Sequence, residues 1–276
     1  NAQDAVDFYV SIFKNSKIGN TSRYGEEVSK AANMPKGTVM IVTFTLNGQE
    51  FMALNGGPIF KFTPAISFFV NCKTESNIDT LFKKLSQGGQ ILMPLDKYHF
   101  SEKYAFLKDR FGVAWQLMLS PEQENIVPCF LFVGKDLGKA KAAVQFYTKV
   151  FKDASIKHIL LYEKGEDGKQ GTVKHSSYFL EEQEFMAVDG TGPHAFAFNE
   201  SLSFMVNCEN QQELDYYWKR LSAVPKAEQC GWLKDKFGIS WQIVPAVLGE
   251  IMSKDKSGRV MKAVLQMKKI DINALV

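Results

Sequence analysis

The sequence predicts an α+β protein built from two tandem repeats, each made of two βαβββ modules. Residues 106–117 (FLKDRFGVAWQL) and 232–243 (WLKDKFGISWQI) share seven of twelve positions. The pentapeptide QEFMA occurs at 49–53 and again at 183–187. Strand and helix patterns alternate and then give way to hairpins, which favours curled sheets with helices on the outside over a doubly wound parallel sheet.

The first repeat follows one pattern of elements. Its expected elements are a helix at 4–14, a strand at 17–24, a hairpin of strands 37–46 and 49–54, a strand at 65–71, a helix face at 78–85, a loop at 88–103 and a strand-turn-strand at 106–117. Asn47-Gly48 is the strongest short hairpin signal. In 106–117, Asp109 opens the turn, and alternation places Trp115 and Gln116 on opposite faces of the second strand.

The second repeat gives the same pattern at corresponding places. Its expected elements are a strand at 127–133, a helix at 143–151, a strand at 155–162, a hairpin of 171–180 and 183–188, a strand at 201–207, a helix face at 214–221 and a strand-turn-strand at 232–243. Asn210 and Glu213 resemble a capping box. The first repeat has no counterpart of strand 127–133, so we expect that strand to belong to a piece before Asn1. The expected domains are 1–122, 123–246 and a helical tail, 247–276.

Composition excludes several classes of protein. The 33 basic and 30 acidic residues give a net charge of +3 and are spread along the chain, so we expect neither nucleic acid nor a membrane as partner. The four cysteines form no CxxC pair, which indicates reduced thiols and a cytoplasmic protein. The sequence contains no GxSxG, Walker or GxGxxG motif, and no catalytic residue is identified.

At several places the chain resembles the PhnB-like branch of the vicinal-oxygen-chelate superfamily, which includes glyoxalases, bleomycin-resistance proteins and extradiol dioxygenases. The resemblance rests on residues 5–13, 93–101, 109–117, 231–242 and 259–272. It implies sheets curled around a concave cavity and a tandem chain equivalent to a fused dimer. We therefore expect a monomer acting as a pseudo-dimer, or a homodimer of it. The family domain is also named after a ubiquinone-pathway methyltransferase, an activity that we do not expect without a glycine-rich cofactor turn.

The resemblance also implies where a metal would be bound. In metal-using relatives a His on the first strand of a module and a Glu on its last strand hold the ion. The His places fall near Ala65, Pro128 and Ser201, and the Glu places fall on Gln116 and Gln242. Neutral amides and apolar side chains are weak ligands, so we expect no metal cofactor.

The first functional hypothesis is a protein that binds a small molecule in cavities with apolar walls and a few polar anchors. The predicted ligand-binding residues are Gln116, Gln242, Ser67, Ser203, Phe44, Tyr178, Met52, Met186, Phe68, Phe204, Asn55 and Asp189. The alternative is a metal-dependent lyase, isomerase or dioxygenase with unconventional ligands from Asn55, Asp189, Glu50, Glu184, His175 or His194. A third possibility is that one repeat keeps a site and the other only supports it.

Overall fold

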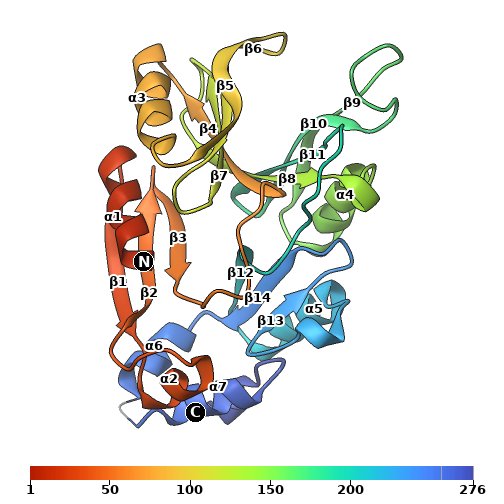
Figure 1. Ribbon diagram of the computed structural model, residues 1–276. Coiled ribbons are helices and arrows are strands. Elements are labelled where there is room, and N and C mark those ends of the chain that lie inside the picture. Colours follow the sequence, from red (N-terminus) through yellow and green to blue (C-terminus); the bar gives the residue numbers. More distant parts are fainter. Residues whose placement is uncertain (256, 276) are drawn as a thin grey trace. The chain divides into compact units, whose positions relative to one another are not determined.

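The computed structural model describes residues 1–255 and 257–275, and the side chains of all of these except Glu27, Ala31 and Ala32. It has the expected α+β architecture (Figure 1). The chain forms two compact units, one of residues 1–21, 41–55 and 61–198 and the other of residues 22–40, 56–60 and 199–276. These units do not coincide with the sequence repeats, because strands of both repeats join in one sheet.

The elements follow the predicted order. The first repeat contains α1 (Ala2–Ile12), β1 (Lys17–Arg23), α2 (Glu26–Ala32), β2 (Val39–Leu46), β3 (Gln49–Leu54), β4 (Ile66–Cys72), α3 (Glu75–Leu85), β5 (Gln90–Tyr98), β6 (Ser101–Lys108) and β7 (Ala114–Leu119). The second contains β8 (Ile126–Phe132), η1 (Gly134–Asp136), α4 (Ala140–Val150), β9 (Ser155–Leu161), β10 (Val173–Leu180), β11 (Gln183–Asp189), β12 (Ser203–Cys208), α5 (Gln211–Leu221), η2 (Pro225–Ala227), β13 (Trp232–Lys234) and β14 (Ser240–Pro245). The tail forms α6 (Leu248–Lys254), α7 (Arg259–Gln266) and η3 (Ile272–Ala274). Residues 256 and 276 of the predicted tail lie outside the described residues.

One eight-stranded sheet joins the second module of the first repeat to the first module of the second repeat. Its strand order is β5-β6-β7-β4-β8-β11-β10-β9. The opening strands of the two modules, β4 and β8, pair antiparallel with Ser67 opposite Cys129. Each opening strand pairs in parallel with the last strand of its own module, β4 with β7 and β8 with β11. Backbone hydrogen bonds between β4 and β8 therefore join the two repeats at the centre of this sheet.

The outer modules form separate three-stranded sheets, ordered β1-β2-β3 and β12-β14-β13. The hairpin predicted at Asn47-Gly48 is confirmed, and both residues have positive φ, 50° and 83°, as a type I′ turn requires. Helix α2 was not predicted. The capping prediction for α5 is confirmed, because the Asn210 side chain accepts a hydrogen bond from the Glu213 backbone N–H at 3.0 Å.

The prediction of a loop at 88–103 is wrong. These residues form β5 and the start of β6, a long hairpin at the end of the eight-stranded sheet. Ile91, Met93 and Leu95 do alternate, but the register shifts repeatedly on both sides of Met93, near Pro94, which cannot donate to a ladder. The second repeat has only the short helix η2 at the corresponding place.

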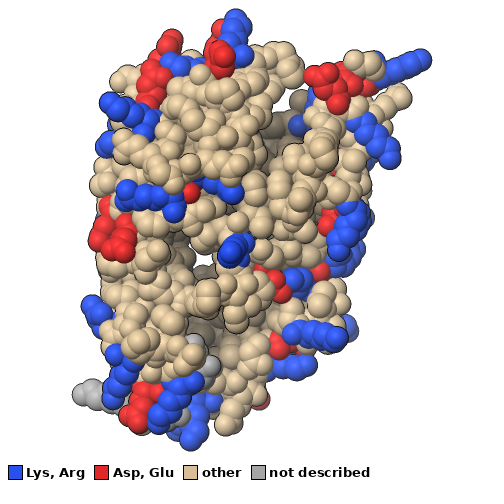
Figure 2. All heavy atoms as spheres, viewed as in Figure 1, with Lys and Arg blue, Asp and Glu red and all other residues tan. Residues whose placement is uncertain are grey.

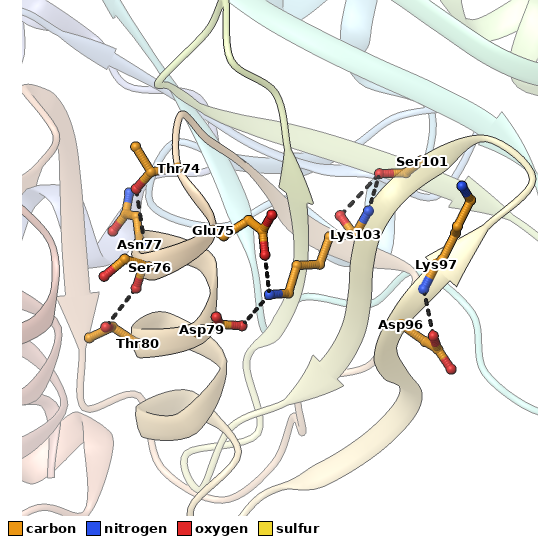
Figure 3. Close-up of polar contacts among 10 residues, drawn as sticks. All are labelled: Thr74, Glu75, Ser76, Asn77, Asp79, Thr80, Asp96, Lys97, Ser101 and Lys103. Carbon is orange, nitrogen blue, oxygen red and sulfur yellow. Dashed lines mark hydrogen bonds and ion pairs between the residues drawn. The ribbon is translucent and has the colours of Figure 1, made fainter.

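An ion-pair cluster fastens α3 to β6 (Figure 3). The Lys103 ammonium lies 2.7 Å from Asp79 and 3.3 Å from Glu75, both on α3. The hydrogen bond to Asp79 raises the pKa of Lys103. Thr74 caps the same helix by accepting from the Asn77 N–H at 3.2 Å.

A buried aspartate organises each repeated strand-turn-strand. Asp109 accepts hydrogen bonds from the backbone N–H groups of Phe111 at 2.8 Å and Val113 at 3.1 Å, and from Trp115 Nε1 at 2.8 Å. The phenol of Tyr9 on α1 donates to the same carboxylate at 2.7 Å. Asp235 accepts the equivalent three bonds from Phe237, Ile239 and Trp241. The repeated sequence of the turn is thus explained by local structure.

Candidate functional site

In the part of the chain that the structure describes, helices cover one face of the eight-stranded sheet and leave the other without them. Helices α3 and α4 cover the outer face, and the ends β5–β6 and β9–β10 diverge (Figure 1). We call the other side the open face. A buried cluster lies on it, made of Phe69, Tyr104, Val127, Cys129 and Met186, with the partly exposed Met93, Tyr98, Phe106, Met118 and Val188 packed against it. Figure 2 shows a recess between the diverging ends and basic and acidic side chains standing next to one another on the surface in view.

A row of polar side chains crosses the centre of the open face. The Tyr104 phenol donates to Gln116 Oε1 at 2.6 Å, and Gln116 Nε2 donates to Ser67 Oγ at 2.8 Å. The buried Cys129 thiol interacts with both Gln116 and Ser67. Strands β7, β4 and β8 supply Gln116, Ser67 and Cys129. The register places Ser67 opposite Cys129, whereas Gln116 is opposite Phe69 and reaches Ser67, two residues earlier on the same face of β4.

Every member of this row is uncharged. Burial raises the pKa of Cys129 to about 12, with Gln116 and Ser67 acting in the opposite direction. Burial also raises the pKa of Tyr104 well above its usual value. A phenol, an amide, a hydroxyl and a thiol can orient a carbonyl or hydroxyl group, but this donor set does not fit a divalent ion.

The cysteines provide a direct check of this description. The thiolate is the reactive form, so a pKa near 12 leaves a thiolate fraction of about 10⁻⁴ at about pH 8. We expect iodoacetamide to alkylate Cys129, and likewise Cys72 with its pKa of about 12, about a thousandfold more slowly than an ordinary thiol in the native protein. The more exposed Cys230 should react first. Peptide mass spectrometry after timed labelling measures this order, and early labelling of Cys129 would contradict the buried row.

The second unit carries a partial copy of the row. Gln242 Nε2 donates to Ser203 Oγ at 2.8 Å, as Gln116 does to Ser67. Trp232 pairs with Gln242 as Phe106 pairs with Gln116, so Cys230 occupies the place of Tyr104. This copy therefore lacks the phenol that holds the amide oxygen.

The predicted aromatic ligand residues lie on the other side of their strands. Phe68 pairs with Trp115 in register and packs against its ring at 5.3 Å, and Phe204 packs against Trp241 at 5.6 Å. Phe44 stacks on Tyr9 of α1, and the buried Tyr178 stacks on Phe185. Neighbouring residues of a strand point to opposite faces, so Phe68 cannot share a face with Ser67. We therefore leave these four residues out of the proposed site.

The predicted ligand residues Met52, Met186, Asn55 and Asp189 also do not form one site. Met186 is buried in the open-face cluster, whereas Met52 at the same place of the repeated pentapeptide is 46% exposed on β3. Asn55 accepts from the N-terminal ammonium group of Asn1 and from the Ala2 N–H, at the start of α1. Asp189 accepts from the N–H groups of Gly138 and Ala140 at the start of α4, and from Val173. Both residues therefore fasten helix N-termini.

The residues of the metal hypothesis are dispersed. Glu50 is exposed on β3, and the half-buried His194 contacts the Thr191 carbonyl at 2.9 Å. His175 lies against His158, a partner that sequence reasoning missed, with 2.7 Å between His175 Nδ1 and His158 Nε2. Across the described residues, no three His, Cys, Asp or Glu side chains gather as metal ligands do. Sequence reasoning also missed Tyr104 and Cys129, because only the strand register brings them to Gln116.

Two further findings concern a small pocket and the lengths of the helices. A partly open pocket of about 20 Å³ beside Phe13, Asn71 and Asn125 has room for a single water and lies apart from the polar row. In the part of the chain that the structure describes, no helix is long and apolar enough to span a bilayer.

Comparison with known proteins places the chain in a family. The family model described as 3-demethylubiquinone-9 3-methyltransferase matches residues 1–118 and again residues 124–244. The chain is similar to a putative 3-demethylubiquinone-9 3-methyltransferase, PhnB protein, from Bacillus cereus, with 50% identity, 43% of this chain and 91% of that chain covered, and a TM-score of 0.40. A protein from Staphylococcus aureus is 37% identical, with 42% and 85% covered and a TM-score of 0.19.

A mutant of glyoxalase I from Zea mays shares the fold alone, with 10% identity, 87% of this chain and 88% of that chain covered, and a TM-score of 0.54. No curated protein matches the chain. Because the family model matches twice and covers most of the sequence, the chain belongs to the 3-demethylubiquinone-9 3-methyltransferase family, as a tandem two-repeat member.

Proposed function

We propose that this protein binds a small, largely apolar molecule on the open face of the eight-stranded sheet, without a metal cofactor. The observation that carries the proposal is the uncharged polar row, Tyr104, Gln116, Ser67 and Cys129, set into a cluster of apolar side chains. Sparse polar groups among apolar walls are typical of ligand sites. The row would orient one carbonyl or hydroxyl group of the ligand, while Phe69, Met118 and Met186 contact its apolar body.

Several features support a binding protein over a metal-dependent enzyme. Gln116 is a neutral amide whose oxygen is occupied by the Tyr104 phenol. Its neighbours on β4, β8 and β11 are Ser67, Cys129 and Met186, and none of these carries a charge at neutral pH. The name of the family refers to methyl transfer, but the sequence offers no glycine-rich turn for a nucleotide-like methyl donor.

We further propose that the chain acts in the cytoplasm as a monomer in which the two repeats replace two subunits. The antiparallel pairing of β4 with β8 supports this, because it builds the open face from both repeats of one chain. Light scattering coupled to gel filtration would give the mass of one chain. A dimeric mass would instead favour a homodimer of the tandem protein.

The binding proposal is tested with the neutral apolar dye Nile red, whose fluorescence increases in an apolar site. We expect Gln116→Leu to weaken dye binding about tenfold. The substitution removes the hydrogen-bond partner that Tyr104 and Ser67 share, so the side chains of the row are no longer held in their orientation. The matched control is Gln242→Leu, which removes the same Gln–Ser contact in the other unit. Equal affinity of the wild type and of Gln116→Leu, or an equal loss in both variants, would overturn the assignment of the site to the open face.

A further inference from the structure

Two histidines lie edge to edge at one end of the open face. His158 is on the edge strand β9, and His175 is on its neighbour β10. The ring planes differ by 16° and the centroids are 4.9 Å apart, while His158 Nε2 and His175 Nδ1 are 2.7 Å apart. The centroid distance equals the N–N distance plus about one ring radius on each side, so the rings are nearly coplanar and meet at these nitrogens.

This geometry is that of a shared proton. In a nearly linear N–H···N contact one nitrogen donates along the line to the other, and either ring can be the donor. A metal ion would need both lone pairs to converge on a third point, which coplanar rings facing each other do not offer. Among the described residues, Nε2 of His175 has no hydrogen-bond partner, so this nitrogen is left for a ligand.

The charged groups around the pair come from three strands. Glu184 on β11 accepts from Ser177 at 2.5 Å and from Asn125 at 3.1 Å, and Lys157 on β9 lies 3.7 Å from the same carboxylate. Glu184 and Lys157 act on His175 in opposite directions. On β10, Lys174 is paired with Glu166 at 2.6 Å.

The surroundings of the His175 ring disfavour a positive charge on it. Burial, and then the neighbouring His158, lowers the pKa of His175 to about 4. Near neutral pH the His175 ring therefore cannot carry protons on Nε2 and Nδ1 at the same time. A proton that arrives at Nε2 is accommodated only if the Nδ1 proton passes on to His158 at the sheet edge.

We propose that His158 and His175 form a proton relay that accepts the proton of a weakly acidic hydroxyl compound, a phenol or an enol, bound against the open face. The relay deepens the proposed binding function and rests on it. In the receptive state His175 carries its proton on Nδ1 and donates it to His158 Nε2. The ligand O–H bond breaks as an N–H bond forms at His175 Nε2, and the Nδ1–H bond of His175 breaks as an N–H bond forms at His158 Nε2. The products are a bound oxyanion, a neutral His175 that donates to it, and a His158 imidazolium.

The apolar wall for such a ligand lies beside the pair. Met186 pairs in register with Ser177, two residues from His175, and belongs to the open-face cluster. Ser67 on β4 is three strand spacings from β10, about 14 Å along the sheet. A single aromatic ring therefore occupies the histidine end without reaching the polar row, and a longer molecule can contact both.

The test uses 4-nitrophenol, whose absorption distinguishes the phenol from the phenolate. We expect the probe to bind the wild-type protein and to show the phenolate band at a pH where the free compound is mostly protonated, shifting its apparent pKa downward by about one unit. His175→Gln and His158→Gln should reduce the bound phenolate fraction about tenfold while the probe still binds. The controls are His99→Gln and His194→Gln, which change the two remaining histidines of the chain.

A second measurement does not depend on the variants. Because the chain has four histidines, the ¹⁵N spectrum of its imidazole rings is simple, and a through-hydrogen-bond coupling should connect His158 Nε2 with His175 Nδ1. Absence of that coupling, or a bound probe that stays protonated in the wild type, would overturn the relay. If Nile red binds and 4-nitrophenol does not, the relay fails and the binding function stands. If neither binds, both proposals fail.

Discussion

Replacing Asp109 by alanine is expected to lower the free energy of unfolding by about 4 kcal/mol. The substitution leaves the Trp115 indole, the Tyr9 phenol and two backbone N–H groups without their acceptor. Each buried donor left unpaired costs about 1–3 kcal/mol, and partial relaxation of the turn keeps the total below the sum. Burial, and then the charge of Asp109, raises the pKa of Tyr9, so this phenol remains a donor over the whole neutral range.

Urea denaturation followed by tryptophan fluorescence measures this loss. Asp109→Asn should be intermediate, because Oδ1 can still accept the two turn bonds whereas an amide nitrogen would face the Trp115 indole. Asp235→Ala should be similarly destabilising, since Asp235 is 1% exposed and holds the equivalent turn. Asp167→Ala, a change in an exposed loop, should stay within about 0.5 kcal/mol of the wild type. A small effect of Asp109→Ala would show that the turn holds without its acceptor.

The sequence predicts the modules well because each is encoded locally. Asp109, Gly112 and the alternating residues after them define a strand-turn-strand twice, and the structure confirms that Trp115 and Gln116 point to opposite faces. The Asn47-Gly48 hairpin and both tail helices are local in the same sense. The β5–β6 hairpin was missed because its register shifts break the alternating pattern on which the prediction depends.

The candidate site could not be predicted in full because it depends on pairing between distant strands. Ser67 and Cys129 are opposite each other only because β4 and β8 pair across the two repeats. Ser67 and Phe68 are adjacent on β4 and point to opposite faces, so a shift of one residue in the strand register decides which of them faces the ligand. The residue types alone favoured both as ligand-binding residues. The His158–His175 contact depends on a β-bulge-containing pairing of β9 with β10, which no spacing in the sequence reveals.

Replacing Met186 by lysine is expected to cost about 3 kcal/mol of unfolding free energy and to abolish Nile red binding. Met186 is 6% exposed and packs with Phe69 and Cys129, so the change removes apolar contacts and places an ammonium group in the cluster. Met52→Lys is the matched control, because Met52 stands in the identical pentapeptide but is 46% exposed, and a change there should stay within about 0.5 kcal/mol. Calorimetry and urea denaturation measure both changes.

A conservative variant separates binding from folding. Met186→Leu keeps the apolar volume and should cost less than about 1.5 kcal/mol while retaining dye binding. If Met186→Lys and Met52→Lys destabilise the protein equally, the open-face cluster does not contribute the packing described here. If Met186→Lys is destabilising but still binds Nile red with wild-type affinity, the dye site lies elsewhere. The two lysine variants therefore compare two copies of one pentapeptide. The copy that contains Met186 lies in the sheet shared by both repeats, and the copy that contains Met52 does not, so we expect the two copies to have different roles.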